Sequence, residues 1–396
     1  MRALLPLVVV IGCSGGSVGE PAPSEENNTS VVVIPANGID GMPGVQAALY
    51  LRKLAPMIVG RVLTTDERSR LERDGGAAIE PILTAWGEEP GFVARARERI
   101  EMELAVGGSQ GAIDFGLPGN TVAKVVRDRE PWSTILTAST CYDAEGAPIA
   151  CDTGAPYTAG LLTTRAYMAS HRGRFNLSRA RTMLSTFACQ KYPLADGHEP
   201  RIDKTHLIPM FRATSPEEQT EDAARAGFGN GLACYSCHGQ FGRHAQLFVK
   251  FDESGLWVEG ATGLQSTAEG AEIGRSDDGL MTSHLVVPEE ASSEASQWFG
   301  TPVSNLAGAA AVLGSSIEFH ECTARNLLTD VLGLASGADV SSELLASVIV
   351  DVRKRNVDPT YQEIVTATFA HPKVAFTALN EFQSRSGTAT TAEEGP

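Results

Sequence analysis

Apolar residues recur at helical spacing in two parts of the chain, one toward each end. Between residues 45 and 108 the pattern is helical, and Thr64 stands three positions before Glu67, which is the spacing of a capping box. In such a box the two side chains satisfy backbone amides that the first turn of a helix leaves free. Leu71 and Ile79 follow at apolar positions, so this part of the chain predicts two or three short helices.

The C-terminal third has the stronger helical pattern. Leucines and valines between residues 327 and 332 form an apolar stripe at three-and-four spacing, which is typical of a helix that faces a core. Gly333 and Gly337 are predicted breaks, and Ser341-Ser342 and Asp358-Pro359 are predicted helix starts. We expect a helical unit here.

The middle of the chain has no sustained helical period. Residues 113–157 are rich in Gly, Pro, Asp and Thr, which predicts loops with short elements. A second capping box, Ser215-Pro216-Glu217-Glu218, predicts one helix. Two apolar runs, 246–251 and 256–258, flank Asp252-Glu253-Ser254-Gly255, which predicts a small β-hairpin. The fold class expected from these patterns is mainly α and loop-rich.

Composition adds a charge argument. The 396 residues contain 48 acidic and 32 basic side chains, and the net charge is -16. Nucleic acids and acidic lipids carry phosphates that this negative charge would repel. We therefore expect no nucleic-acid binding, and a basic partner protein fits the charge better.

The N-terminus has the pattern of an exported, lipid-anchored protein. Arg2 precedes an apolar run that ends in Val10-Ile11-Gly12-Cys13, which resembles the lipobox of bacterial lipoproteins. We expect residues 1–12 to be a signal peptide, Cys13 to be lipidated, and residues 13–40 to form a flexible tether. The alternative is a secretory signal without lipid. The expected location is the cell envelope, as a lipid-anchored protein of the periplasm or outer membrane.

Seven cysteines are present, and four of them remain after Cys13 and a pair at 234 and 237 are set aside. An even remainder fits a compartment that permits disulfides. Of three connectivities we favour Cys141 with Cys151, a local clip, together with Cys189 and Cys322, which would join distant parts of the chain. The alternative is that some of these thiols stay reduced and buried.

Cys234-Tyr235-Ser236-Cys237-His238 is the one strong chemical signal. Two thiols at this spacing can form thioethers with the vinyl groups of haem, and the adjacent histidine can bind the iron as its proximal ligand. A zinc site, a redox dithiol and a plain disulfide are the alternatives. A zinc site would need a second ligand pair, and Gly-rich flanks are unlike the strand and helix around a thioredoxin dithiol. The expected cofactor is one covalent haem c.

The sequence does not determine which residue is the sixth iron ligand. Met281, 43 residues beyond His238, has suitable chemistry and is favoured. Alternatives are His284, His244 and Met210, or a vacant position. The other five histidines are interpreted as packed or surface residues, namely His171, His198, His206, His320 and His371.

With this motif placed, the chain divides into six parts. In order they are the signal peptide 1–12, the tether 13–40, an N-terminal helical region 41–130, a loop-rich haem-binding region 131–300, a C-terminal helical domain 301–383, and a disordered tail 384–396.

The order of short motifs resembles a group of secreted, cytochrome-c-like proteins of unassigned function in planctomycetes and myxobacteria. The matching pieces, spread over residues 160–376, are Gly160-Leu161-Leu162-Thr163, Cys189, the haem motif, Phe251-Asp252 with Gly255, and Phe319-His320-Glu321-Cys322. The resemblance implies a cytochrome-c-like haem region in a larger helical protein, and its two single cysteines favour the pairing of Cys189 with Cys322. The chain departs from that family directly after the haem motif, where it has Gly239-Gln240-Phe241-Gly242.

Three functions follow from this sequence. The first is electron transfer by a monohaem lipoprotein to a redox partner protein. The second is a haem enzyme with an open distal site, peroxidase-like or supporting another oxidative step. The third is a surface binding protein with structural haem. A minimal cytochrome needs only about one hundred residues, the size of one domain, so much of this chain has another role.

Overall fold

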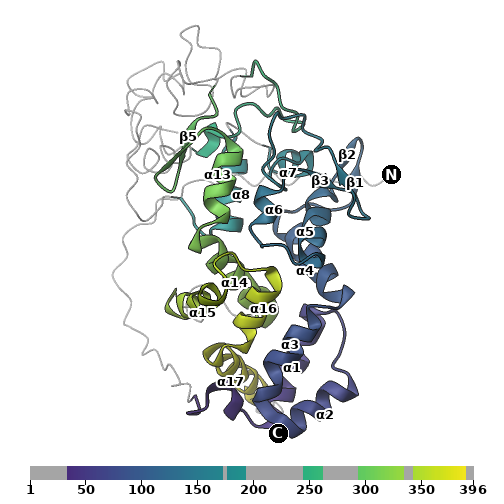
Figure 1. Cartoon of the computed structure of the whole chain (residues 1–396), viewed down its shortest axis with the longest axis vertical. Coiled ribbons are helices and arrows are strands. Elements are labelled where there is room, and N and C mark those ends of the chain that lie inside the picture. The colour runs from purple at the N-terminus through teal and green to yellow at the C-terminus, as the bar shows by residue number, and fades with distance from the viewer. Residues whose placement is uncertain (1–33, 173–175, 193–243, 262–292, 334–341, 389–396) are drawn as a thin grey trace, which may run out of the picture.

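The computed structural model describes residues 34–172, 176–192, 244–261, 293–333 and 342–388, and it confirms a mainly helical protein with small two-stranded sheets (Figure 1). The helices are α1 (Gly44–Ile58), α2 (Thr65–Asp74), α3 (Ile79–Trp86), α4 (Pro90–Glu103), α5 (Leu117–Arg127), α6 (Thr134–Thr137), α7 (Arg165–Ser170), α8 (Leu177–Phe187), α13 (Leu306–Gly314), α14 (Ile317–Leu332), α15 (Ser342–Arg355), α16 (Tyr361–Ala370) and α17 (Pro372–Thr388). The strands pair as antiparallel hairpins β1 (Ser109–Gln110) with β2 (Ile113–Asp114), β3 (Cys141–Tyr142) with β4 (Pro148–Ile149), and β5 (Ser296–Trp298) with β6 (Thr301–Val303).

The N-terminal helical pattern gives four helices, α1 to α4, where the sequence predicts two or three. The capping box is confirmed at the start of α2: Thr64 Oγ1 accepts from the Glu67 amide at 3.2 Å, and the Glu67 carboxylate accepts from the Thr64 amide at 2.7 Å. The additional helix arises because the glycines at 75 and 76 form a 3-10 turn, which separates α2 from α3.

The C-terminal helices begin and end close to the predicted signals. α14 ends at Leu332, and Gly333 has a φ of 64°, the left-handed conformation that glycine adopts without strain after a helix. α15 begins at Ser342. The start predicted at Asp358-Pro359 lies further along, because Thr360 caps α16 and forms a capping box with Glu363.

Helices from the two ends of the chain pack together (Figure 1). α3 lies against α16, and α1 contacts both α14 and α17. The buried Tyr50 hydroxyl of α1 donates to the carbonyl oxygen of Phe369 in α16 at 2.9 Å. The N-terminal region 41–130 and the C-terminal domain 301–383 therefore share one hydrophobic core.

Three predictions for the middle of the chain need correction. Residues 113–157 contain α5, an 11-residue amphipathic helix, where loops were expected. The hairpin expected at 246–258 is reduced to one antiparallel bridge between Phe251 and Trp257, because residues 244–246 are helical and 247–250 form turns. Residues 301–303 are a strand, so the C-terminal helices begin only at Leu306.

Regular structure also begins earlier and ends later in the chain than the expected boundaries. Gly38–Gly41 form a 3-10 helix within the expected tether and contact α17, so ordered structure begins before residue 41. α17 continues to Thr388 and so includes the first five residues of the tail expected from Ser384. The rest of both segments lies outside the described residues.

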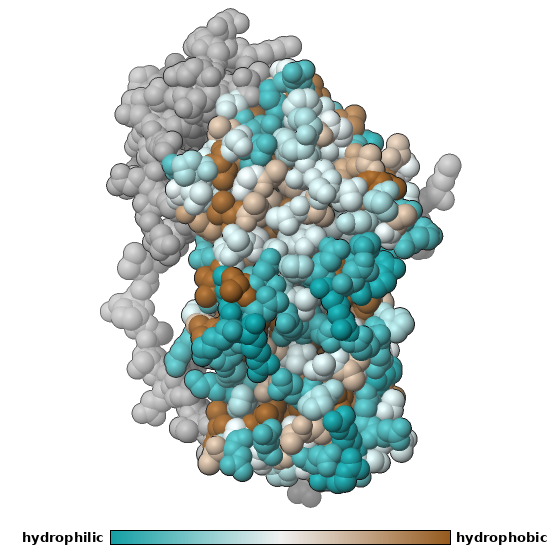
Figure 2. Space-filling view, viewed as in Figure 1, coloured by the Kyte–Doolittle hydropathy of each residue, from teal (hydrophilic) through white to brown (hydrophobic). Residues whose placement is uncertain are grey.

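The face drawn in Figure 2 is hydrophilic over much of its lower half, and apolar residues appear there in separate small groups. Exposed single apolar side chains such as Val45 and Val62 are normal for a water-facing surface. Within the part of the chain that the structure describes, no helix has the length and apolar character needed to cross a membrane.

Candidate functional site

The residues predicted to hold haem and lipid lie outside the described residues. These are Cys234, Cys237 and His238, the favoured distal ligand Met281, and the lipidation site Cys13. The alternative ligands Met210 and His284, the capping box at 215–218, Gly337, and the histidines at 198 and 206 lie outside them as well.

The described residues on either side of residues 193–243 lie together. His244 is 5% exposed, its Nδ1 atom is hydrogen-bonded to the Tyr192 hydroxyl, and its ring centroid lies 4.2 Å from that of Trp298 in β5. The Gln246 amide donates to the Ser293 carbonyl oxygen, and Lys250 Nζ donates to the Ala261 carbonyl oxygen at 3.1 Å. The described residues that border 193–243 and 262–292 in the sequence therefore contact one another.

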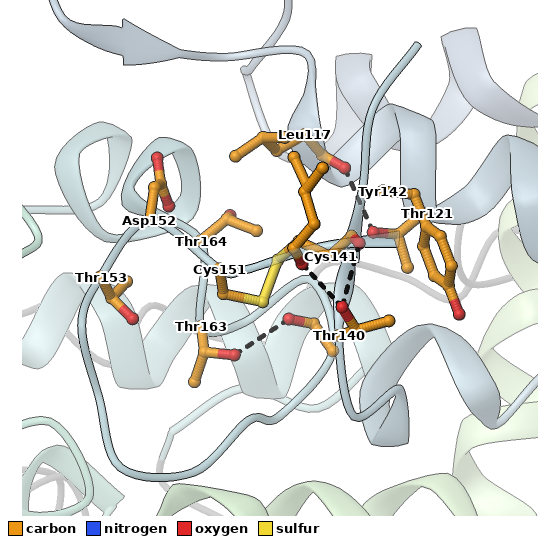
Figure 3. Close-up of a disulfide and its surroundings, with 12 residues drawn as sticks. Leu117, Thr121, Thr140, Cys141, Tyr142, Cys151, Asp152, Thr153, Thr163 and Thr164 are labelled. Carbon is orange, nitrogen blue, oxygen red and sulfur yellow. Dashed lines mark hydrogen bonds between the residues drawn. A yellow bond between two sulfur atoms is a disulfide. The ribbon is translucent and has the colours of Figure 1, made fainter. Parts of the chain in front are cut away.

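The first disulfide is the local clip predicted from the sequence, between Cys141 in β3 and Cys151 just after β4 (Figure 3). The Asp143 carboxylate accepts from the Ala147 amide at 2.7 Å inside the closed turn. Beside the disulfide, Asp152 Oδ1 accepts from the Arg165 amide at 2.7 Å, so it satisfies the first amide of α7, whose N-cap is Thr164. Burial raises the pKa of Asp152. These contacts give the clip a structural role.

The second disulfide joins Cys189, which follows α8, to Cys322 in the middle of α14. The two residues are 133 positions apart in sequence, and their Cα atoms are 5.1 Å apart. Cys322 is buried, and its sulfur lies 3.2 Å from the Thr186 carbonyl oxygen. The predicted pairing of Cys189 with Cys322 is therefore confirmed. Both disulfides fit a location outside the cytoplasm.

A small cavity lined by both apolar and polar side chains lies next to the second disulfide. Its volume is about 20 Å³, and residues from α4, α8, α14 and α16 line it, including Arg99, Glu103, Thr186, Asn326 and Tyr361. Arg99 Nη1 donates to the Tyr361 hydroxyl at 2.5 Å, and Asn326 Nδ2 donates to Glu103 Oε2 at 3.3 Å. Sequence reasoning missed this site. Its one local signal is the four-residue spacing of Arg99 and Glu103, which places them on one face of a helix.

Ionisation in the cavity differs from that of free side chains. Burial, with a further contribution from the charge of Asp330, raises the pKa of Glu103 to about 8, although Arg99 and Asn326 act against this. Burial raises the pKa of Tyr361, and the charges of Glu103 and Asp330 raise it further, against an opposing effect of Arg99. Glu103 is therefore a carboxyl group that is largely neutral at pH 7.

Three of the histidines interpreted as packed residues are described, and each is partly or fully buried. His171 Nδ1 is 3.3 Å from Thr182 Oγ1, His320 Nδ1 is 3.2 Å from Arg353 Nη1, and His371 Nε2 is 3.3 Å from Ser347 Oγ. Burial lowers the pKa of all three, to about 4 for His171 and His320. Among the described residues, no group of three or more His, Cys, Asp or Glu could hold a metal ion.

Comparisons with protein-family models, with curated proteins and with solved structures found no match to this chain.

Proposed function

We propose that this protein is a monohaem c-type cytochrome that transfers single electrons outside the cytoplasm. The observation that carries the proposal is the sequence Cys234-Tyr235-Ser236-Cys237-His238. Cys234 and Cys237 would attach the porphyrin, and His238 would bind the iron on the proximal side. The haem would supply one-electron chemistry, and the protein would set its orientation, its solvent exposure and its axial ligands.

The pairing of the other cysteines supports this proposal. Cys141, Cys151, Cys189 and Cys322 form the two disulfides, which leaves Cys234 and Cys237 outside them. Disulfides persist in oxidising compartments, where covalent attachment also prevents loss of haem. Lipidation of Cys13 would hold the protein at a membrane surface, and the acidic charge favours a basic redox partner.

Met281 is the proposed distal ligand. A thioether ligand raises the reduction potential relative to an imidazole, which suits a carrier that accepts electrons easily. His284, His244 and Met210 remain alternatives. In the structure one ring nitrogen of His244 is already bonded to Tyr192. The resemblance to secreted cytochrome-c-like proteins is part of the same proposal.

Expression of the full chain in a host with haem-attachment machinery tests the cofactor. We expect a pyridine haemochrome spectrum of c type, with one haem per chain. A variant with both Cys234→Ala and Cys237→Ala should lose its haem on denaturation, whereas His206→Gln, a histidine change in the same part of the sequence, should retain covalent haem. A colourless protein that binds zinc instead would overturn the proposal.

A second experiment separates electron transfer from catalysis. Met281→Ala should abolish the far-red charge-transfer band of the oxidised protein, and Met210→Ala should leave it unchanged. Rapid carbon monoxide binding by the reduced wild type would favour the haem enzyme with an open distal site, because a carrier with two strong axial ligands offers no free position.

A further inference from the structure

The cavity beside the Cys189–Cys322 disulfide has the size and the polar groups to hold a water molecule. Its volume of about 20 Å³ exceeds the roughly 10 to 15 Å³ that one water needs. The cavity lies where helices from both ends of the chain meet: α4 from the N-terminal part and α14 and α16 from the C-terminal part.

Two polar atoms of residues that line this cavity have no hydrogen-bond donor or acceptor among the described residues. Arg99 is 7% exposed, and its Nε atom forms an ion pair with Asp330 Oδ2 at 3.4 Å but has no hydrogen bond to a described residue. Asn326 Oδ1 lies 3.4 Å from the sulfur of Cys189, but a disulfide sulfur carries no hydrogen and so donates no hydrogen bond. One donor and one acceptor are thus available to a single water, which can both accept and donate.

The charges around the cavity do not balance when every group is ionised. Arg99 is the cation of the cluster, while Glu103 and Asp330 are both carboxyl groups. Asp330 keeps 37% of its side-chain surface exposed, whereas the carboxyl group of Glu103 lies among protein atoms. Water therefore solvates the charge of Asp330 better, and Glu103 is the group that remains neutral.

We propose that this cavity is a proton-exchange site, in which a water molecule held by Arg99 and Asn326 takes up the carboxyl proton of Glu103. In this step the O–H bond of the carboxyl group breaks, the proton passes through the bound water to the solvent, and a carboxylate remains between Arg99 and Asn326. No electrons are transferred. The site is independent of the proposed haem function.

Infrared spectroscopy of the full chain tests the site, because a neutral carboxyl group has a carbonyl stretch distinct from that of carboxylates and amides. We expect such a band at pH 7 that disappears with a midpoint near pH 8. It should be absent from Glu103→Gln and present in Glu98→Gln, which removes an exposed carboxylate from the same helix. Absence of the band in wild type at pH 7, or its persistence in Glu103→Gln, would overturn the proposal.

Asn326→Ala provides a second test if Glu103→Gln fails to fold. This change removes the amide that donates to the Glu103 carboxylate and one of the two groups assigned to the water. The carboxylate form loses a hydrogen bond, so the proton affinity of Glu103 should rise several-fold and the midpoint should move to higher pH. A midpoint that stays where it is in wild type would contradict the assigned geometry.

Discussion

Two regions of this molecule are built in different ways. The lower helical region comprises α1 to α4 and α14 to α17, and the upper loop-rich region comprises the described residues from β1 to α13 (Figure 1). In the lower region, helices of eight to seventeen residues satisfy most of their own backbone hydrogen bonds and bury apolar faces against one another. Trp86 and Leu51, for example, are fully buried.

In the upper region, buried polar side chains and disulfides supply the stabilising contacts that longer helices supply in the lower region. The buried guanidinium of Arg179 donates to the carbonyl oxygens of Met168, Phe251 and Asp252 at 3.0, 2.8 and 2.5 Å. Three of the four disulfide cysteines lie here. Short elements leave backbone groups without partners, and buried side chains must supply those partners. We therefore expect the stability of the upper region to depend mainly on specific polar contacts, and that of the lower region to depend mainly on apolar packing.

Removal of the long disulfide should have the largest effect. Cys189→Ala with Cys322→Ala releases a loop of 133 residues, which corresponds to about 5 kcal/mol of unfolding free energy in the chain-entropy treatment. The matched pair Cys141→Ala with Cys151→Ala releases 10 residues, for about 3 kcal/mol. Urea denaturation followed by circular dichroism measures both. Equal losses would show that loop length does not set the contribution.

Loss of the buried Arg179 should rank next. Arg179→Met retains much of the apolar stem but leaves the carbonyl oxygens of Met168, Phe251 and Asp252 without a donor, which should cost about 3 to 5 kcal/mol. Hydrogen exchange should increase mainly around the Phe251–Trp257 bridge. Arg181→Met, an exposed change on the same helix, is the control and should be nearly neutral. Equal exchange in the two variants would show that Arg179 does not hold this turn.

Acidification should destabilise the protein through its buried histidines. Burial, with the nearby charge of Arg353, lowers the pKa of His320 from 6.5 to about 4. The unfolded chain therefore binds more protons below pH 6.5, so stability falls between pH 6.5 and 4 and levels off below that. The loss is about 3 kcal/mol for one such group. His320→Gln should reduce the number of protons taken up on unfolding by one in that pH window, as measured by the pH dependence of urea unfolding.

His171 in the upper region has the same lowered pKa of about 4, with burial as the main cause. The comparison of His171→Gln with His320→Gln therefore asks whether the two regions unfold together. If the two regions form one cooperative unit, each variant should lower by one the number of protons taken up in the same unfolding transition. Two separate acid transitions would show that the regions unfold independently.

The sequence predicted the lower region better than the upper one, for physical reasons that particular residues show. Thr64 and Gly333 are local signals that act within one helical turn, so they can be recognised without tertiary structure. α5 was missed because Pro118 and Gly119 resemble a turn. Proline is tolerated in a first helical turn, and a side chain at Gly119 would collide with Glu101 of α4, so close packing explains the glycine.

The candidate sites show the same division. A haem-attachment motif is local, so the sequence alone predicts it. The cavity beside the Cys189–Cys322 disulfide depends on residues of four helices, and Arg99 and Tyr361 are 262 positions apart. No spacing rule brings them together. Only the packing of the two chain ends reveals that Glu103 and Asp330 share a single arginine.

The smallest predicted effects concern the two capping boxes, which lie in the lower region but at opposite ends of the chain. Thr64→Ala and Thr360→Ala each remove a hydroxyl that accepts a backbone amide at 3.2 Å, and each should cost about 1 kcal/mol. Because α3 packs against α16, the two helical segments should unfold as one unit, and the double variant should lose the sum of the single losses in one transition. Far-UV circular dichroism and tryptophan fluorescence should give the same midpoint. Different midpoints would show that the shared core does not couple the two chain ends.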